Sequence, residues 1–575
     1  MALMTRIKKS ISLLLAVGLF SGCAMSAPAP QPEVQPDSDR RTIPYSQMEV
    51  QESNAQQILS ELDNMIAFVE RGIDIEQLME KEESLDEMLE SYYTSSSLAN
   101  LKCYQNSSDG QAWAVSDELS MEGQMVDSAV MEYLRSVVNS PLQQQYREEL
   151  GEYCYDVLQK QLQTNSQQAV EVLQKRVGLN NEYNETLSNL RVEWNGEQLR
   201  IQDVLSRTDI PQEDLYGLIV DYYVGNYDYF SQLYLDMIAY DKQAAAICGY
   251  DDAVQWRYDS FGRQYTLQQV EQLFEDIKTY LVPLQQQVMY NDAMSTSLTY
   301  KKGVQTVETV FEETAPELQE VWQFMNKYEL LSLQAEEDKM SGVAFTTNLM
   351  KYDAPFIYMY WGDTVNDAFT LVHEFGHACD KYFQFENEEY AQDLDKSETF
   401  SQGLEQVMQN HLANKLGEDE EHLEQAKLAD MLQIICYQAA LEDFQIRAYR
   451  LDDSATGADL AQLYAQVLHE YGYYSIFGEY DPTWFEVTHF FDAPFYTISY
   501  VTSATAALEL GKMESEEPGK GLQVWLNMLS TNRDQSFEDF LKESGIDSPF
   551  ESGRIQQCAE FLEEKLIGEQ MQIAA

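Results

Sequence analysis

The chain carries two histidines and a glutamate at a spacing that could hold a metal ion. They lie in the stretch "FTLVHEFGHACDKYF", where His373, Glu374 and His377 stand out because the 575 residues include only six histidines. On a helix, residues four apart share one face, so the two imidazoles can converge on one ion. Glu374 lies about a quarter turn from His373 and could reach a water molecule on that ion. The pattern favours zinc-dependent hydrolysis, and the alternative is a surface helix with exposed histidines.

A catalytic zinc ion needs a third protein ligand and an open position for water. The downstream stretch "DKSETFSQGLEQVMQN" is the best source of that ligand. Ser397 is expected to cap a helix on which Glu398, Ser401, Gln402 and Glu405 share one face. Because the chain has 97 acidic residues, spacing alone leaves open a solvated acidic helix edge.

Hydrolysis of a peptide bond also needs hydrogen-bond donors for the oxyanion that forms. The stretch "THFFDAPFYTISYVTS" offers His489, Tyr496 and Tyr500. The alternative for these residues is packing in a core, since the chain contains 37 tyrosines.

The spacing of apolar residues predicts the helix that must carry the two histidines. Asp363 and Thr364 are suitable residues for its start. Gly376 costs roughly 1 kcal/mol against alanine in a helix interior. That cost indicates that another backbone comes close to Gly376, and the alternative is a glycine that the helix merely tolerates. Apolar side chains follow the start at helical intervals, at Val365, Phe369, Val372 and Phe375.

The rest of the chain reads mainly as helices. Residues 51–190 have apolar positions every three or four residues, as amphipathic helices do. Asn195-Gly196 predicts a tight hairpin. The β-branched and aromatic residues of "GVAFTTNLM" and "APFIYMYW" predict two strands just before the histidine helix. The expected fold class is therefore mainly α, with a small β-sheet beside that helix.

"HEFGH" followed by "ETFSQGLE" resembles the thimet oligopeptidase and oligoendopeptidase F family of zinc metallopeptidases. The resemblance implies that His373, His377 and Glu398 bind one zinc ion per chain. It also implies that Glu374 is the general base and that Glu405 is a second carboxylate that supports the ligands.

The same resemblance implies an opposite wall, a fold and a substrate. His489, Tyr496 and Tyr500 would face the zinc as catalytic donors, and two helical lobes would enclose a deep substrate channel. Oligopeptides would be the substrates. The similarity extends over about residues 190–565 and is weak before that. Asp380 stands where many members have histidine, and it is expected to lie beside the ligands.

The N-terminus predicts export and a lipid anchor. Basic residues precede the short apolar run "ISLLLAVGLF", and "LFSGC" resembles a lipobox that ends at Cys23. A lipid on Cys23 would hold a soluble body on the extracytoplasmic face of a bacterial membrane. The expected organisation is a lipoprotein signal peptide at 1–22, an anchor and flexible tether at 23–50, an N-terminal helical region (channel wall or lid) at 51–225, and a catalytic region at 226–575.

Charge and cysteine content limit the other functions. The formal net charge of -60 argues against nucleic-acid binding, which requires basic patches. The cysteines after Cys23 form no CxxC pair. Cys103 and Cys154 could form a disulfide in an exported protein, and buried free thiols are the alternative.

Together these features predict a zinc-dependent oligopeptidase that hydrolyses internal bonds of short unstructured peptides outside the cytoplasm. The alternative is a lipid-anchored peptide-binding protein of the same fold that no longer turns over. The sequence predicts neither the cleavage specificity nor the oligomeric state.

Overall fold

The computed structural model describes residues 40–384, 393–416 and 420–568. The predicted signal peptide, Cys23 and most of the predicted tether lie outside these residues. The described chain is mainly helical, as the sequence predicts, and it forms three hydrophobic cores. Among the described helices, none combines the length and the apolarity that crossing a membrane requires.

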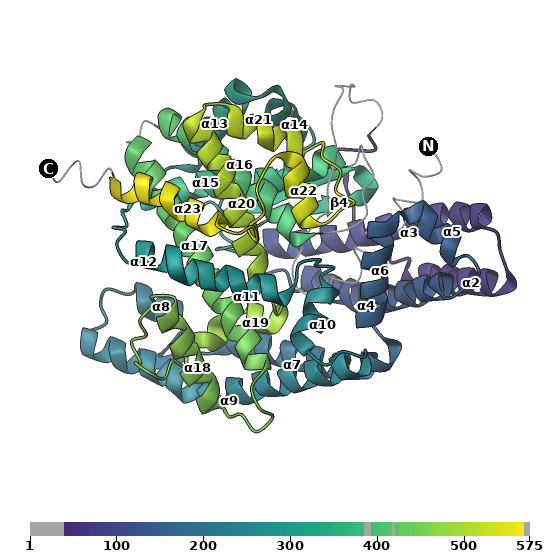
Figure 1. Cartoon of the computed structure of the whole chain (residues 1–575), viewed down its shortest axis with the longest axis horizontal. Coiled ribbons are helices and arrows are strands. Elements are labelled where there is room, and N and C mark those ends of the chain that lie inside the picture. The colour runs from purple at the N-terminus through teal and green to yellow at the C-terminus, as the bar shows by residue number, and fades with distance from the viewer. Residues whose placement is uncertain (1–39, 385–392, 417–419, 569–575) are drawn as a thin grey trace.

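The first core belongs to an arm of helices on one side of the molecule (Figure 1). Asp74 and Asp109 begin two of these helices by accepting hydrogen bonds from backbone N–H groups of the first turn. The arm confirms the helices predicted after residue 51. Its elements are α2 (Ala55–Arg71), α3 (Ile75–Gln105), α4 (Gly110–Val138), α5 (Gln143–Leu150) and α6 (Glu152–Thr164).

The second core is built from the middle of the chain and from later segments, which include α17, α18 and parts of the chain after residue 483. The predicted hairpin is present, and Asn195 and Gly196 have the positive φ angles of a tight primed turn. The elements are α7 (Val170–Asn189), β1 (Val192–Trp194), β2 (Glu197–Leu199), α8 (Ile201–Ser206), α9 (Gln212–Ile247), α10 (Ala253–Ser260), α11 (Leu267–Asp276), α12 (Val282–Gln285), α17 (Glu420–Tyr449) and α18 (Gly457–Glu470).

The third core contains the histidine helix and the sheet. Both predicted strands are confirmed, as β4 (Ala344–Leu349) and β5 (Ala354–Met359), and the sheet has the order β3-β5-β4. The short β3 (Leu331–Ser332), parallel to β5, was not predicted. The helices are α13 (Tyr300–Thr314), α14 (Pro316–Lys327), α15 (Val365–Gln384), α16 (Leu394–Leu416), α21 (Lys520–Met528) and α22 (Phe537–Ser544).

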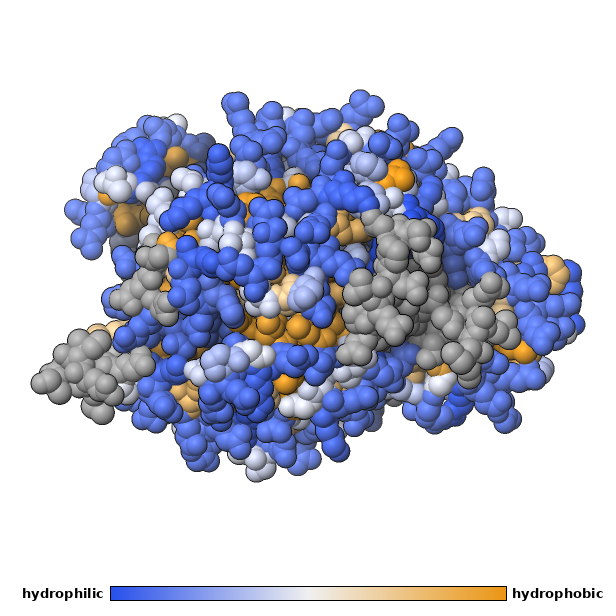
Figure 2. All heavy atoms as spheres, turned by 90° about the horizontal axis from the view of Figure 1, so that it is seen from above, coloured by the Kyte–Doolittle hydropathy of each residue, from blue (hydrophilic) through white to orange (hydrophobic). Residues whose placement is uncertain are grey.

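A long helix late in the chain packs into both the second and the third core. α20 (Thr497–Glu516) contributes Ile498 and Val501 to the second core and Ala506 and Leu510 to the third. The short α19 (His489–Asp492) precedes it, and α23 (Arg554–Glu563) packs against it near the C-terminus. The surface is largely hydrophilic, with hydrophobic atoms exposed near the middle of the face in Figure 2.

The six cysteines among the described residues are all buried, and none of them forms a disulfide with another described cysteine. Cys103 lies on α3 and Cys154 on α6, and no disulfide joins them. Of the two alternatives that the sequence left open, the structure has the free thiols.

Candidate metal centre

The start of α15 is fixed by side-chain hydrogen bonds. The N–H of Thr364 donates to Asp367 Oδ2 at 2.7 Å, and the Thr364 hydroxyl donates to the same oxygen at 2.8 Å. Asp363 has a φ of 61° and accepts hydrogen bonds from the backbone of Leu298 and Tyr300. The predicted helix start is confirmed, and it anchors the histidine helix to the segment before α13.

Gly376 sets how closely α15 and α16 approach. A Cβ atom at Gly376 would lie 2.7 Å from the Cα of Ser401 and 2.8 Å from the carbonyl oxygen of Phe400. No real Cβ contact is that short, so only glycine allows the two backbones to pack in this way. The close backbone approach that the sequence indicated is confirmed, and it brings α16 against the face of α15 that carries the histidines.

The start of α16 differs from the prediction. Ser397 was expected to cap this helix, but α16 begins at Leu394 and Ser397 lies inside it. The cap is Asp393, whose carboxylate accepts hydrogen bonds from the N–H groups of Asp395 and Lys396. Both Asp and Ser favour caps, and the earlier of the two holds the position. Ser397 is thereby free to face His377.

His373, His377 and Glu398 converge on one point. Each offers a ligand atom, and these atoms all lie within 4.8 Å of one another. Glu398 Oε2 is 3.6 Å from His373 Nε2 and 3.8 Å from His377 Nε2. Two imidazole nitrogens and one carboxylate oxygen are the donor set of a catalytic zinc site, so these residues fit that ion.

The second ring nitrogen of each histidine also has a partner. His373 Nδ1 is 2.7 Å from Glu405 Oε1, and His377 Nδ1 is 3.3 Å from the hydroxyl of Ser397. These contacts leave both Nε2 atoms directed toward Glu398. Glu405, which the family resemblance offered as a supporting carboxylate, therefore contacts one histidine directly.

Glu405 is a buried carboxylate with two cationic neighbours. Lys427 Nζ on α17 lies 2.6 Å from its Oε2. Burial alone would raise the pKa of Glu405, but Lys427 and His373 outweigh it and lower the pKa to about 2. Burial lowers the pKa of His373, but the hydrogen bond that His373 donates to the Glu405 carboxylate reverses this and raises the pKa to about 9.

Glu374 is oriented by the sheet. The Thr346 hydroxyl on β4 lies 2.7 Å from Glu374 Oε2 and 2.9 Å from the Glu374 carbonyl oxygen. Burial raises the pKa of this carboxyl, and the nearby His373 and Thr346 oppose the shift. A carboxylate with a raised pKa beside a metal site is suited to accept a proton.

The opposite wall brings His489, Tyr496 and Tyr500 together. Their ring centroids lie 5.1 to 6.0 Å apart, and the Tyr496 hydroxyl donates to Glu398 Oε1 at 3.1 Å. The backbone of Phe495 has a φ of 67°, a costly conformation for an aromatic residue. Its N–H donates to Gln445 Oε1, and this turn directs Tyr496 toward Glu398.

Asp380 has Arg533 as its ion-pair partner, and among the described residues it has no hydrogen bond with the three candidate ligands. Its carboxylate forms an ion pair with Arg533, at 2.7 Å, and both side chains are fully buried. Position 380, three residues after His377 and seven after His373, shares the face of the histidines about one turn further along α15, where the segment before α22 presents Arg533. Asp380 thus ties α15 to the segment before α22.

Two residues of the centre were missed from the sequence. Thr346 sits within a predicted strand and Lys427 follows Glu405 by 22 residues, so neither has a spacing that relates it to the histidines. The alternation of side chains along β4 could have placed Thr346 on one face of the sheet but not beside Glu374. Nothing in the sequence indicated that Lys427 would lie near the metal centre.

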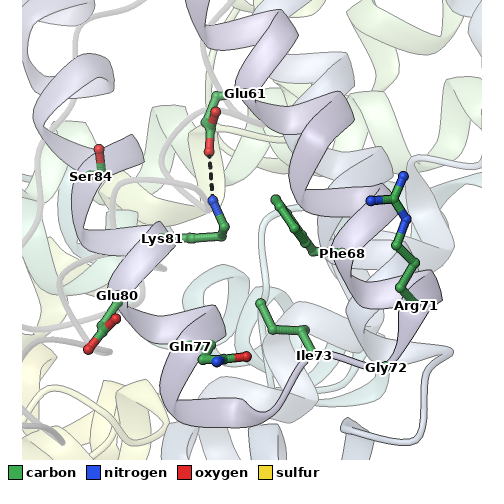
Figure 3. A pocket seen from close by; sticks show the side chains of 9 residues that line it. All are labelled: Glu61, Phe68, Arg71, Gly72, Ile73, Gln77, Glu80, Lys81 and Ser84. Atoms are coloured by element: carbon green, nitrogen blue, oxygen red, sulfur yellow. Dashed lines mark hydrogen bonds and ion pairs between the residues drawn. The ribbon is translucent and has the colours of Figure 1, made fainter.

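A shallow pocket lies elsewhere, between α2 and α3 in the arm (Figure 3). Lys81 and Glu61 form an ion pair across it at 3.3 Å, and the Lys81 ammonium lies 4.4 Å from the ring centre of Phe68. These charged groups satisfy one another, and the lining includes no histidine or cysteine. The pocket offers no chemistry comparable to that of the metal centre.

Comparisons with known proteins agree with this geometry. Residues 303–560 match the model of peptidase family M3, and residues 45–165 match the model of the peptidase M3 N-terminal domain. The second match corrects the expectation that similarity is weak before residue 190. The arm therefore belongs to the same family as the metal centre.

Two curated relatives align with part of the chain. The oligoendopeptidase F homolog of Borreliella burgdorferi is 25% identical over 208 residues, which are 34% of this chain and 34% of that protein. Oligopeptidase PepF of Bacillus subtilis is 25% identical over 229 residues, 37% of this chain and 33% of that protein. The aligned segments span about a third of the length of these relatives.

Solved structures share the fold over nearly the whole chain. PZ peptidase A with an inhibitor has a TM-score of 0.78 at 20% identity, covering 91% of this chain and 99% of that one. Oligoendopeptidase F from Enterococcus faecium has a TM-score of 0.58 at 16% identity, covering 90% and 99%. Because the models of peptidase family M3 and of its N-terminal domain match residues 303–560 and 45–165, this chain belongs to peptidase family M3.

Proposed function

We propose that this chain is a zinc-dependent oligopeptidase that hydrolyses internal bonds of short, unstructured peptides. The observation that carries the proposal is the convergence of His373, His377 and Glu398, with Glu374 on the same helix. The His373 side chain is 25% exposed, whereas that of Glu398 is only 4% exposed. Water and substrate can therefore approach the centre from the His373 side.

The residues of the site divide the chemistry between them. Zinc held by the three ligands supplies Lewis acidity, which activates a water molecule and polarises a carbonyl group. Glu374, oriented by Thr346, takes up the proton from the water and delivers it to the leaving amine. His489 and Tyr500 donate hydrogen bonds to the oxyanion, and the Tyr496 hydroxyl, whose single proton is directed at Glu398 Oε1, does so only after it leaves that carboxylate. Burial lowers the pKa of His489, so its ring is neutral near pH 7 and retains one N–H donor.

The edge of β4 supports an extended peptide as the substrate. Tyr360 N–H donates to the Val343 carbonyl, and hydrogen-bonded pairs alternate along an antiparallel ladder. The backbone groups of Ala344, Thr346 and Asn348 therefore point away from β5, and none of the hydrogen bonds between described residues uses them. A peptide strand added there would lie next to Glu374 and would be recognised through its backbone.

We also propose an extracytoplasmic location. Its support is the sequence of the signal segment and Cys23 alone. Labelling of the expressed chain with a radioactive fatty acid tests it, because Cys23→Ser should abolish the label and release the protein from the membrane. A labelled Cys23→Ser chain would contradict the proposal.

Zinc analysis and peptide cleavage test the proposed activity together. The purified chain should contain one zinc ion and should cleave a library of quenched fluorescent peptides. A chelator should abolish cleavage, and added zinc should restore it. Tight peptide binding without hydrolysis would instead favour a binding protein of the same fold, and a chain that binds no zinc would overturn the proposal.

A further inference from the structure

The two metal-binding histidines are supported by different kinds of partner. The Nδ1 atom of His373 contacts the carboxylate of Glu405, whereas that of His377 contacts the neutral hydroxyl of Ser397 at the longer distance of 3.3 Å. A carboxylate partner fixes the ring orientation and makes the opposite nitrogen a stronger ligand. The stronger support therefore reaches the metal through His373, and it depends on what holds Glu405.

Lys427 holds the other oxygen of Glu405. Its ammonium is 2.6 Å from Glu405 Oε2 and 3.1 Å from Asp430 Oδ2 on the next turn of α17. Lys427 is 4% exposed and Glu405 is 6% exposed, so water screens this pair only weakly. With one oxygen on His373 and the other on Lys427, the Glu405 carboxylate cannot rotate away from the histidine.

The ion pairs show why this lysine matters once a metal is bound. Among the described residues, Glu405 has ion pairs with His373 and Lys427 alone. A histidine that binds a metal is neutral and cannot act as a counterion. Lys427 is then the one cationic side chain paired with Glu405 among the described residues, and without it the buried carboxylate is offset only by the metal ion beyond His373.

Lys427 also lies between the second and third hydrophobic cores. His373 and Glu405 lie on α15 and α16 of the third core, whereas residues 428–449 of α17 pack into the second core. α17 also places Leu423 in the third core, so Lys427 contacts Glu405 at the point where α17 passes from the third core to the second.

We propose that Lys427 is a positioning residue for the metal centre, which acts on His373 through Glu405. The inference rests on the proposed zinc site. Removal of second partners of metal-binding histidines lowers metal affinity by roughly 10- to 100-fold, and one step further out we expect about tenfold.

Zinc affinity, measured by competition with a fluorescent chelator, tests the inference without any substrate. Lys427→Met should raise the Kd about tenfold, and Lys427→Arg, which keeps the charge, should stay near wild type. Lys565→Met is the matched control, because Lys565 pairs with Glu424 on the same helix at 2.9 Å but leads to no metal-binding residue. It should bind zinc like the wild type.

A double variant shows whether the effect passes through Glu405. In the Glu405→Gln background, Lys427→Met should weaken zinc binding no further. An equal loss in both backgrounds, or an unchanged Kd in Lys427→Met, overturns the inference. If the methionine variant fails to fold by circular dichroism, Lys427→Gln replaces it in the same cycle. A wild-type chain that binds no zinc overturns the proposed function instead, so the two failures are distinguishable.

Discussion

Buried acids occur both in the arm and at the metal centre, and they are held in opposite ways. In the arm, Glu82 accepts hydrogen bonds from the hydroxyls of Tyr133 and Tyr146, and Asp127 accepts one from Tyr93. Burial raises the pKa of Glu82 to about 7 and that of Asp127 to about 8. At the metal centre, Glu405 is buried as Glu82 is, whereas Asp127 is half-buried.

The neighbours of Glu405 make the difference. Lys427 and His373 overcome the effect of burial and lower its pKa to about 2. Two hydroxyl partners satisfy the hydrogen bonds of Glu82 but do not offset the effect of burial on its pKa, whereas the cations beside Glu405 do. Glu405 is therefore held in its charged form, whereas burial shifts Glu82 and Asp127 toward the neutral form.

The largest expected effect is on catalytic activity, and it distinguishes Glu374, beside the metal centre, from Glu82, a buried acid of the arm. Glu374→Gln should lower kcat/KM for a quenched peptide by roughly 10²- to 10⁴-fold, because it removes the group that accepts the proton. Zinc content should remain at one per chain. Glu82→Gln, in the arm, should leave kcat/KM unchanged, and a Glu374→Gln enzyme with wild-type turnover would remove Glu374 from the mechanism.

A second comparison concerns one glycine from each region. Gly376→Ala should lower the free energy of unfolding by roughly 3 kcal/mol, because its Cβ would meet the backbone of α16. Gly123→Ala in α4 places its Cβ 3.5 Å from the Tyr92 hydroxyl, an ordinary contact, and should stabilise by about 1 kcal/mol. Denaturant unfolding measures both, and equal effects would show that the helix contact at Gly376 is not tight.

The pH dependence of stability tests the acids of the arm. The pKa of Glu82 is higher in the folded chain than in the unfolded one, so the folded state binds more protons between about pH 4 and pH 7. Stability from this group is present at low pH and is lost as the pH rises through 7. Between pH 5 and pH 8, the free energy of unfolding of Glu82→Gln should fall by about 2 kcal/mol less than that of the wild type. Parallel pH profiles of the two proteins would contradict the raised pKa.

The smallest effect concerns the hydroxyl that orients Glu374. Thr346→Val keeps the shape of the side chain but removes the hydrogen bond, and it should lower kcat about tenfold, or ~1.4 kcal/mol. Thr347→Val is the control, because Thr347 is similarly buried on the opposite face of β4. If both variants behave alike, the hydrogen bond does not orient the base.

Local patterns in the sequence predicted much of this molecule. The hairpin at Asn195-Gly196, both strands of the small sheet and the start of α15 follow from turn chemistry, β-branched residues and capping. Gly376 predicted the close approach of a second backbone, which is that of α16. Each of these depends on neighbours within a few positions along the chain.

The residues that were missed depend on contacts between distant segments. Lys427 reaches Glu405 only because α17 crosses α16, and Arg533 reaches Asp380 from 153 positions away. Ser397 was assigned to the helix cap by a rule that Asp393, four residues earlier, also satisfies. Asp393 holds the cap position in the structure. Periodicity places a side chain on a face, but the packing of helices decides which partner meets it there.

The close packing of α15 against α16 at Gly376 has a consequence for the lifetime of the protein. The two helices that it joins supply all three candidate ligands, and they form the centre of the third core. An ion that binds only this arrangement stabilises the folded chain by about 4 kcal/mol when its concentration is a thousand times its Kd. Zinc supply would then set how much of the protein survives proteolysis as well as how much of it is active.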